Sequence, residues 1–447
     1  MNLIDIYDYL LLPLYLMIFY FIIVIKAKKY GDSPLRKYFI IGFFLHMGGS
    51  ILYCMVIYYY YTYGDSILFY QGGTFLRNVI SSTGDPISPF FMSSGELLKT
   101  YGTLGTDDNI LPVSIGIDSN LAVMKISAIV SYLCFNSYLI ISLFFGLFAF
   151  TGLWKLYKTF NEIMERKSER WLAYTVLFLP SVCFWGSGLI KDSICLGCLG
   201  FVVYYVYRIF IKKKFRYLDF LFLAIFLYLL FVIKSYLLVA FIVAACLGYV
   251  VHLVRESKTS VLKLTIRLLI LASVVVIGLI TFSSVLSAAI EDFMGNIETF
   301  KYAYSNLDED LNGSGFVFSA TDYSISGLLL GSPIAIFTTL FRPFLWESGK
   351  PVIFLSALES ALILAATLYL LIKCRVTRFF YYTFTNPYAF FCFTFCMMLA
   401  LIVGYSTFNF GTMVRYRLPI LPFYFFLLLF IYTKNKEDRN ATDHIQT

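Results

Sequence analysis

Charged residues are scarce in this chain. Only 14% of its 447 residues are charged and 60% are hydrophobic, with a mean hydropathy of +0.78. A soluble domain carries about 25% charged residues. One water-soluble core cannot hide this much apolar surface, so the composition excludes a soluble globular protein. It predicts an all-α, polytopic integral membrane protein.

Several catalytic motifs are also missing. The sequence has only three histidines and lacks HExxH, GxxxxGK[ST] and GxSxG. This argues against a metalloprotease, an ATP-driven pump and a serine hydrolase, and no metal site is predicted. Cys195 and Cys198 have metal or redox spacing, but they lie in an apolar run without a second pair, which favours packing at a helix contact. His46 is interpreted as a packing residue, with a proton relay as the alternative.

Long apolar runs dominate what is present. Runs of about 20 residues can cross a bilayer, and scanning for them predicts about eleven spans. No internal repeat is visible, so residues 1–447 are predicted to form a single integral membrane domain. The predicted spans cover residues 9–25, 39–61, 124–150, 172–189, 194–210, 218–233, 236–253, 264–290, 352–372, 390–404 and 418–432.

The basic residues predict the orientation. Of the 35 Lys and Arg residues, 25 fall in loops on one side of these spans, which the positive-inside rule makes cytoplasmic. The amino terminus is then outside and the carboxyl terminus inside. The first span has no basic region before it and no small-residue cleavage site, so it is interpreted as a retained span. The basic loops are 26–37, 155–170, 208–216, 255–267, 373–378 and 434–439.

The opposite side receives two long loops, at residues 62–122 and 291–351. Loops longer than about 12–15 residues are usually functional. Apolar patches within them are predicted to form short helices along the membrane surface. These patches are residues 87–92, 316–318 and 328–340.

Six basic residues lie at the ends of spans on this outer side, where the positive-inside rule does not place them. A charge costs about 2.5–3.5 kcal/mol at the bilayer centre and less near the interface. A carboxylate, a water-filled cleft or an anionic ligand should offset that cost. The six are Lys125, Lys191, Lys234, Arg342, Arg415 and Arg417.

Asp65, in the stretch Gly64-Asp65-Ser66, follows the second predicted span. A carboxylate there can take the proton from an attacking hydroxyl in an inverting glycosyl transfer, or help to hold a metal on a leaving phosphate. The alternative is a turn or capping aspartate, because Gly-Asp-Ser is common in turns. Asp85 and the pair at 107–108 are possible second carboxylates, with ordinary loop residues as the favoured alternative.

Residues 180–193 form a connection in which Pro180 and two glycines should interrupt a helix and expose backbone groups to a cavity. Lys191 is predicted to bind phosphate as a point charge, with Asp192 orienting it. A self-neutralising Lys191–Asp192 pair is the alternative. Lys234 repeats the pattern at the next outer turn, unless it simply extends to the interface.

Arginines mark the last two candidate positions. Arg342, Trp346 and Glu347 could form a wall for a phosphate and a sugar, because arginine binds phosphate through two parallel hydrogen bonds. The alternative is an interfacial Arg–Glu pair beneath an anchoring tryptophan. Arg415 and Arg417 flank Tyr416 at the mouth of the last span, and two guanidiniums this close repel each other unless an anion lies between them.

These residues resemble a known group. Gly64-Asp65-Ser66 with Tyr70 is similar to the first-loop aspartate motif of the GT-C membrane glycosyltransferases. Residues 180–193 and Arg415-Tyr416-Arg417 resemble the polytopic glycosyltransferases and repeat-unit polymerases of bacterial surface-polysaccharide clusters. Two features depart from the pattern. Ser66 stands where an acidic neighbour is usual, and an additional span precedes the one that leads to Asp65.

The resemblance implies a GT-C-like fold in the bacterial inner membrane, with the active site facing outside. Asp65 would be the base or a metal ligand, Arg342, Arg415 and Arg417 would hold a polyprenyl phosphate or diphosphate, and Lys191 would assist. No cofactor would be required, although Mg²⁺ or Mn²⁺ is possible. The implied partners are the polyprenyl-linked donor, a glycan or lipid-linked acceptor and the bilayer, with no nucleic acid.

We therefore expect a glycosyltransferase that uses a polyprenyl-linked sugar or oligosaccharide, either polymerising repeat units or transferring single sugars. The alternative is a flippase for lipid-linked oligosaccharides, or another transporter without catalysis. A transporter should carry charges deep in its spans and internal repeats. Glu359 is the one acid that the sequence places deep in a span.

Overall fold

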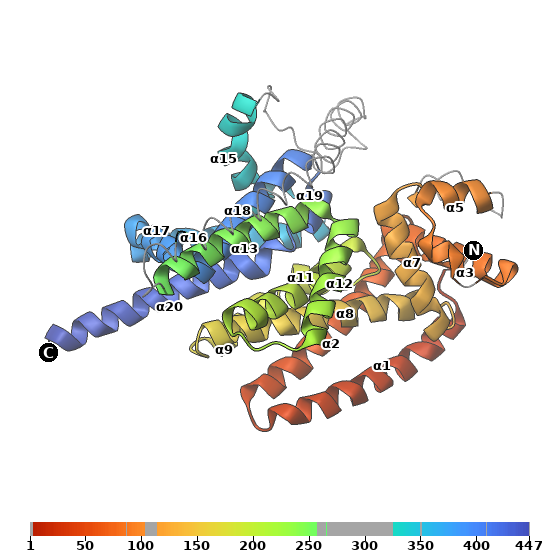
Figure 1. The fold of residues 1–447 in the computed structure, drawn as a ribbon, viewed down its shortest axis with the longest axis horizontal. Coiled ribbons are helices and arrows are strands. Elements are labelled where there is room, and N and C mark those ends of the chain that lie inside the picture. The colour runs from red at the N-terminus through yellow and green to blue at the C-terminus, as the bar shows by residue number, and fades with distance from the viewer. Residues whose placement is uncertain are drawn as a thin grey trace. The chain divides into compact units, whose positions relative to one another are not determined.

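A computed structural model describes residues 3–85, 87–102, 114–256, 265, 325–348, 351–407 and 409–446. Over these residues the secondary structure is helical, apart from one isolated bridge residue (Figure 1). The chain divides into two compact units, Met1–Leu238 and Val239–Thr447. The predicted single integral membrane domain stays a prediction, because division into compact units and insertion into a membrane are separate properties.

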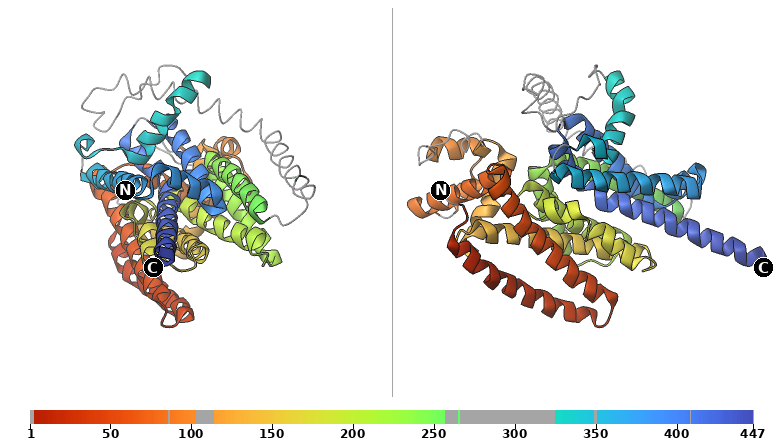
Figure 2. Two further views of the ribbon diagram at one scale, coloured as in Figure 1. Left: turned by 90° about the vertical axis from the view of Figure 1, so that its left-hand side faces the viewer. Right: turned by 180° about the vertical axis from the view of Figure 1, so that it is seen from behind.

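Unit 1 is built around α8, which packs against α2 and α11. Helices α1 and α2 form an antiparallel hairpin, visible from behind in Figure 2. Helix α2 continues into a π-helix, η2, and α11 into a second π-helix, η3. The bounds are α1 Ile6–Ala27, α2 Pro34–Met55, η2 Val56–Tyr61, α8 Tyr138–Ile163, α11 Lys191–Val206, η3 Tyr207–Ile211 and α12 Tyr217–Ile233.

Glycines set the distance between α8 and α11. A Cβ atom added to Gly152 would lie 2.1 Å from the carbonyl oxygen of Gly197. A Cβ on Gly200 would lie 2.0 Å from the carbonyl oxygen of Gly152. Small residues at such contacts allow helix backbones to approach closely. The start of α11, where Lys191 lies, is therefore held against α8 by backbone-to-backbone packing.

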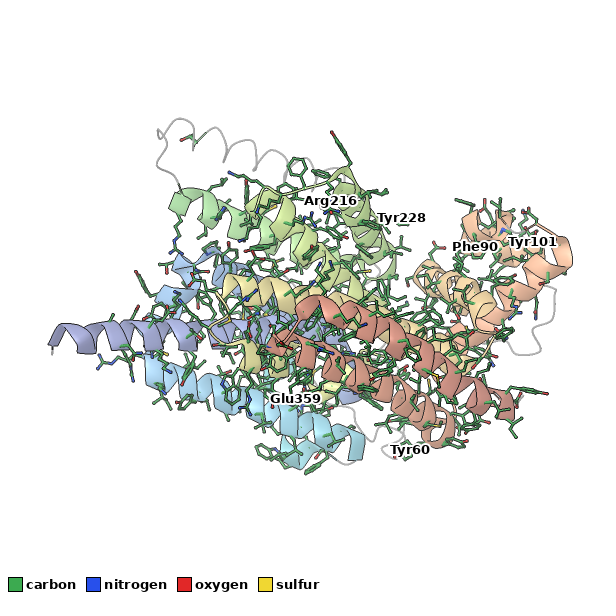
Figure 3. The ribbon with its side chains drawn as sticks, turned by 90° about the horizontal axis from the view of Figure 1, so that it is seen from below. Tyr60, Phe90, Tyr101, Arg216, Tyr228 and Glu359 are labelled. Carbon is green, nitrogen blue, oxygen red and sulfur yellow. The ribbon has the colours of Figure 1, made fainter. Side chains whose placement is uncertain are left out.

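A group of shorter helices covers one end of unit 1, where Figure 1 shows α3, α5 and α7. Figure 3 labels Phe90 and Tyr101 there. The region falls in the predicted outer loop 62–122, and α4 confirms the short helix predicted within residues 87–92. The helices are α3 Asp65–Thr83, α4 Ser88–Phe91, α5 Ser94–Tyr101 and α7 Asp118–Leu133.

The predicted span 124–150 is wrong, because two helices share it. Helix α7 ends at Leu133 and α8 begins at Tyr138. Phe135 and Asn136 have φ angles of +53° and +60°, which end a right-handed helix. The prediction failed because hydropathy averaged over a window does not depend on backbone conformation, so it cannot detect a helix break at two residues.

The predicted span 172–189 is also not one helix. It contains α9 (Glu169–Val176) and α10 (Pro180–Trp185), and Pro180 starts the second because a proline has no N–H to continue the first. The segment still follows α8 lengthwise. The Tyr157 hydroxyl donates to the Glu169 carbonyl at 3.3 Å, and a Cβ on Gly146 would lie 2.9 Å from the Ser187 carbonyl oxygen.

In unit 2, α18 packs against α15 and α20. Thr339 on α15 donates to the Ala400 carbonyl at 2.8 Å, and a Cβ on Gly404 would lie 2.4 Å from the Ala335 carbonyl oxygen. The bounds are α13 Ser235–Glu256 (which begins in unit 1), α15 Ile325–Phe341, η4 Leu345–Glu347, α16 Pro351–Cys374, α17 Val376–Thr385, α18 Pro387–Ser406, α19 Phe410–Tyr416 and α20 Ile420–Gln446.

Seven helices among the described residues are long and apolar enough to cross a membrane. The number is eight if α19 and α20, bent by 62°, count as one span. The chain is thus all-helical with the composition of a polytopic membrane protein, but the expected eleven spans are not reproduced. Residues 218–233 form a shorter apolar helix, and the predicted span 264–290 and patch 316–318 lie outside the described residues, apart from Thr265.

Candidate functional site

One end of unit 1 gathers charged side chains from three helix ends and a serine from a fourth, and we call this group the end cluster. Asp65 lies at the start of α3, Ser119 at the start of α7, and Lys191 with Asp192 at the start of α11. Lys234 is the C-cap of α12. Because helices end here, their terminal backbone groups and charged side chains meet in one place.

The position of Asp65 depends on a sharp change of chain direction. After the π-helix η2, Thr62 has a φ angle of +56° and Gly64 one of +151°, and glycine adopts the latter without steric penalty. Asp65 then occupies the exposed first turn of α3, where the helix dipole favours a carboxylate. Ser66, hydrogen-bonded to the hydroxyl of Tyr138 at 2.8 Å, anchors the turn.

Lys191 stands at the first residue of α11, where the helix dipole opposes a cation. Its ammonium donates to the Ser119 hydroxyl at 2.8 Å. Asp65 is close enough to act on it electrostatically, as is Lys234. Burial and the neighbouring Lys234 ammonium disfavour the charge on Lys191 further, and the carboxylates of Asp65 and Asp192 offset these effects only in part.

Lys234 and Asp192 form a buried ion pair. The distance between Nζ and Oδ1 is 2.5 Å, and the two side chains are 6% and 4% exposed. The contact that Asp192 makes directly is to Lys234; it also acts on Lys191 electrostatically, and its predicted role in orienting Lys191 stays a prediction. Moving two charges out of water has a large desolvation cost, and the close contact between this ammonium and this carboxylate offsets it.

The four charged residues of the end cluster differ in burial and therefore in the chemistry that each can perform. Lys234 and Asp192 neutralise each other below the surface, while Asp65 is exposed and Lys191 half-buried. A carboxylate can accept a proton from a hydroxyl, and an ammonium can bind a phosphate. Asp65 and Lys191 thus place a base and a cation within electrostatic range of each other.

Tyr70, predicted to support Asp65, points to a different neighbour. Its hydroxyl donates to the Asn136 carbonyl at 2.9 Å, in the connection between α7 and α8. Burial raises the pKa of this phenol. Tyr70 therefore holds α3 to that connection, which indirectly supports the start of α3.

In unit 2, Arg342 and Glu347 form a two-pronged ion pair. Arg342 Nε lies 3.0 Å and Nη2 2.5 Å from Glu347 Oε1, with both side chains about one-fifth exposed. Glu347 Oε2 also accepts from the Phe344 N–H at 2.8 Å. The guanidinium lies 5.2 Å from the centre of the Phe410 ring. This is the Arg–Glu pair that the sequence left open as an alternative.

Trp346 lies beside this pair and is 81% exposed. Its ring stacks on Phe344, with a centroid distance of 4.8 Å and an interplanar angle of 20°. An exposed indole held by a second ring can anchor at a membrane interface or stack on a sugar. The sugar-binding role of Trp346 and its alternative, an anchor at the interface, both stay predictions.

Arg417 lies in the interior of unit 2, with 1% of its surface exposed. It donates to the carbonyls of Arg342 at 2.7 Å and Ser356 at 3.3 Å, and Glu359 acts on it electrostatically. Figure 3 labels Glu359 on α16. Arg417 thereby positions the backbone at Arg342, and its predicted phosphate contact stays a prediction.

The crevice around Arg417 is tight. It is lined by residues of α15, α16 and α20 and leaves no room for a water molecule. Arg415, by contrast, is half-buried on the last turn of α19. Of the two arginines predicted as a pair, only Arg415 reaches the surface to an appreciable extent.

The predicted site residues thus fall into two groups. Asp65, Lys191, Asp192 and Lys234 come together in unit 1, with Tyr70 nearby on α3. Arg342, Trp346, Glu347, Arg415 and Arg417 belong to unit 2, and a shared site between the two groups stays a prediction. Asp85 is exposed and accepts from the N–H groups of Ile87 and Ser88. Residues 107–108 lie outside the described part of the chain.

Ser119 was missed by sequence reasoning. The signal was available in Asp118-Ser119-Asn120, since such residues favour the start of a helix, and α7 begins at Asp118. What the pattern could not supply is the partner, because Lys191 is 72 residues away in the sequence.

Comparisons of the chain with protein-family models, curated proteins and solved structures found no match. Among the described residues, no group of three or more His, Cys, Asp or Glu side chains could hold a metal ion. The optional Mg²⁺ or Mn²⁺ stays a prediction. Function is therefore inferred from the end cluster and from the physical chemistry of its residues.

Proposed function

We propose that this protein is a membrane glycosyltransferase that takes a sugar or oligosaccharide from a polyprenyl-phosphate or diphosphate donor. It would act on the extracytoplasmic face of a bacterial inner membrane and assemble surface polysaccharide, by polymerising repeat units or by adding single sugars. The proposal is carried by Asp65 and Lys191, a carboxylate and an ammonium within electrostatic range at one end of unit 1.

The chemistry assigns one role to each charge. The Asp65 carboxylate takes the proton of the acceptor hydroxyl as its oxygen attacks the anomeric carbon of the donor. The bond from that carbon to the phosphate oxygen breaks, and the electron pair leaves with the polyprenyl phosphate. Lys191 stabilises the negative charge that develops there. Lys234 and Asp192 hold the start of α11, and Ser119 holds the ammonium in position.

We further propose that the arginines of unit 2 bind the donor phosphate. The Glu347 carboxylate binds the guanidinium of Arg342, and a donor phosphate would replace this carboxylate as the partner of Arg342. Arg415 offers a second guanidinium closer to the surface. The fork of an arginine matches a phosphate through two parallel hydrogen bonds.

Asp65→Asn tests the proposal in a purified preparation supplied with a polyprenyl-phosphate-linked sugar and a glycan acceptor. Loss of a general base typically lowers a rate by about 10²–10⁴-fold, and we expect a loss of that order in kcat with the donor still bound. Asp32→Asn is the matched control, since Asp32 is an exposed aspartate in the connection between α1 and α2 and has no role in the proposed site. Wild-type turnover by Asp65→Asn would remove Asp65 from the mechanism.

A flippase or other transporter is the second candidate, favoured by the ionisable groups buried in unit 2. Glu359 and Arg417 are 7% and 1% exposed, and buried charges in membrane helices often mark transport pathways. Proteoliposomes with a fluorescent lipid-linked sugar distinguish the two functions. A transporter would move the lipid without forming a glycosidic bond, and Asp65→Asn would still move it.

A further inference from the structure

Helix α17 is short and lies between two spans. Helix α16 ends at Cys374, α17 covers Val376–Thr385, and α18 begins at Pro387. Figure 1 shows α17 beside α16. A ten-residue helix is too short to cross a bilayer. Since the spans on either side both end next to it, α17 lies at a boundary between hydrocarbon and headgroups.

One face of α17 holds it to unit 2. Phe379, Tyr382 and Thr383 are buried, and the Tyr382 hydroxyl donates to Asp438 on α20 at 2.5 Å. Burial raises the pKa of Tyr382 to about 12, so the phenol keeps its proton at neutral pH. The helix is therefore fixed in its orientation by contacts to the rest of the unit.

A second face of α17 is apolar and exposed. Val376 is 54%, Phe380 39% and Phe384 49% exposed, and these residues lie at the i, i+4, i+8 spacing of one helical stripe. The two phenylalanine rings stack on each other at 5.9 Å. Such a stripe on a boundary helix enters the acyl region just below the headgroups.

Basic side chains surround this stripe. Arg375 and Arg378 are exposed, and within the described part of the chain neither has a carboxylate in ion-pair distance. Arg439 on α20 donates to the Lys373 carbonyl at 2.8 Å, which brings the charged end of α20 to the same place. The basic residues there are Lys373, Arg375, Arg378, Lys434, Lys436 and Arg439, with Glu437 and Asp438 as the nearby acids.

Both acids already have partners. Glu437 pairs with Lys434 at 2.7 Å, and Asp438 accepts from Tyr382. A net positive surface thus adjoins a helix whose apolar stripe enters the bilayer. We propose that α17, with Arg375, Arg378 and Arg439, binds the phosphate headgroups of anionic phospholipids. The combination favours a lipid over an acidic protein, since the apolar stripe and the cations share one helix.

The test compares full-length variants in nanodiscs prepared from equal amounts of phosphatidylcholine and phosphatidylglycerol, with retained lipid counted by native mass spectrometry. The wild type should retain phosphatidylglycerol preferentially. Arg375→Gln with Arg378→Gln should lower that preference by about fivefold for each charge removed. Arg375→Lys with Arg378→Lys keeps both charges and should retain the preference.

Lys213→Gln with Lys214→Gln is the matched control, because these exposed lysines follow η3 in unit 1 and are not among the residues of the proposed α17 site. An unchanged preference in the double glutamine variant of α17 would overturn the proposal, as would an equal loss in the control or a loss in the double lysine variant. Binding of an acidic peptide at α17 without any lipid preference would also overturn it.

Discussion

At the scale of single residues, the ion pair of Lys234 and Asp192 has a high desolvation cost and a close contact between its two charged groups. Removing two charges from water costs several kcal/mol per ion, and only close mutual contact offsets it. The pair is 2.5 Å apart and almost fully buried. It joins the end of α12 to the start of α11, so it sets where the neighbouring Lys191 stands.

Lys234→Met should destabilise the protein by about 3–5 kcal/mol, because it leaves Asp192 buried without its cation. The measurement is the thermal unfolding midpoint in detergent. The double variant Lys234→Met with Asp192→Leu should recover most of the loss, since no buried charge remains. Lys99→Met, at an exposed position on α5, is the control and should change stability by less than about 0.5 kcal/mol. An unfolding midpoint unchanged by Lys234→Met would show that the pair is not needed.

The residue scale also separates the two arginines of the 415–417 stretch. The two arginines flank Tyr416 and look equivalent in the sequence. In the structure, Arg417 donates to two backbone carbonyls inside unit 2, whereas Arg415 is half-buried. Sequence reasoning treated both as phosphate ligands. It had no means of separating them, because the carbonyls belong to Arg342 and Ser356, more than sixty residues earlier.

At the scale of elements, close helix contacts decide where the site residues lie. Helix α2 packs on α10 through Gly49, where an added Cβ would lie 2.0 Å from the Cys183 carbonyl oxygen. The neighbouring Gly48 has no atom within 4 Å of the same position. Of these two adjacent glycines, Gly48 has space for a larger side chain and Gly49 does not.

Gly49→Ala should destabilise the protein by about 1–3 kcal/mol, because the methyl group forces α2 and α10 apart. Gly48→Ala should be neutral or slightly stabilising, since alanine favours a helix more than glycine does. Thermal unfolding of both variants in the same detergent measures the difference. Equal midpoints for the two would mean that the α2–α10 contact is looser than the structure has it.

The break between α9 and α10 also belongs to the element scale. Pro180 and the glycines that follow it indicated an interruption, and the structure places one there. The same reasoning overlooked the break at residues 134–137, where Phe135 and Asn136 adopt left-handed backbone without a proline or glycine to signal it. Element ends marked by special residues were predictable, and ends set by packing were not.

At the scale of the whole molecule, the distribution of basic residues predicts which end of unit 1 faces the cytoplasm. Lys212, Lys213 and Lys214 follow η3 at the far end of α11 from Lys191. The positive-inside rule predicts that this end is cytoplasmic and therefore that the end cluster lies outside. The proposed reaction on a flipped, lipid-linked donor requires this orientation.

Single cysteines on a cysteine-free background test the orientation. Tyr63→Cys lies next to Asp65, where Tyr63 is 55% exposed, and Lys214→Cys lies at the opposite end. A membrane-impermeant maleimide added to intact spheroplasts should label position 63 and leave position 214 unlabelled until the membrane is permeabilised. Labelling of position 214 alone in intact cells would place the end cluster inside and exclude extracytoplasmic transfer.

The sequence by itself determined the class of protein, because hydropathy and helical length are local properties that survive without tertiary information. It located most of the long helices and indicated Asp65, Lys191 and Lys234 as charges in an unusual place. The tertiary structure decided the partners: Lys234 with Asp192, Lys191 with Ser119, and Arg417 with backbone carbonyls. These contacts depend on which distant helix ends meet. Because packing across the whole unit decides this, no single stretch of the sequence could predict them.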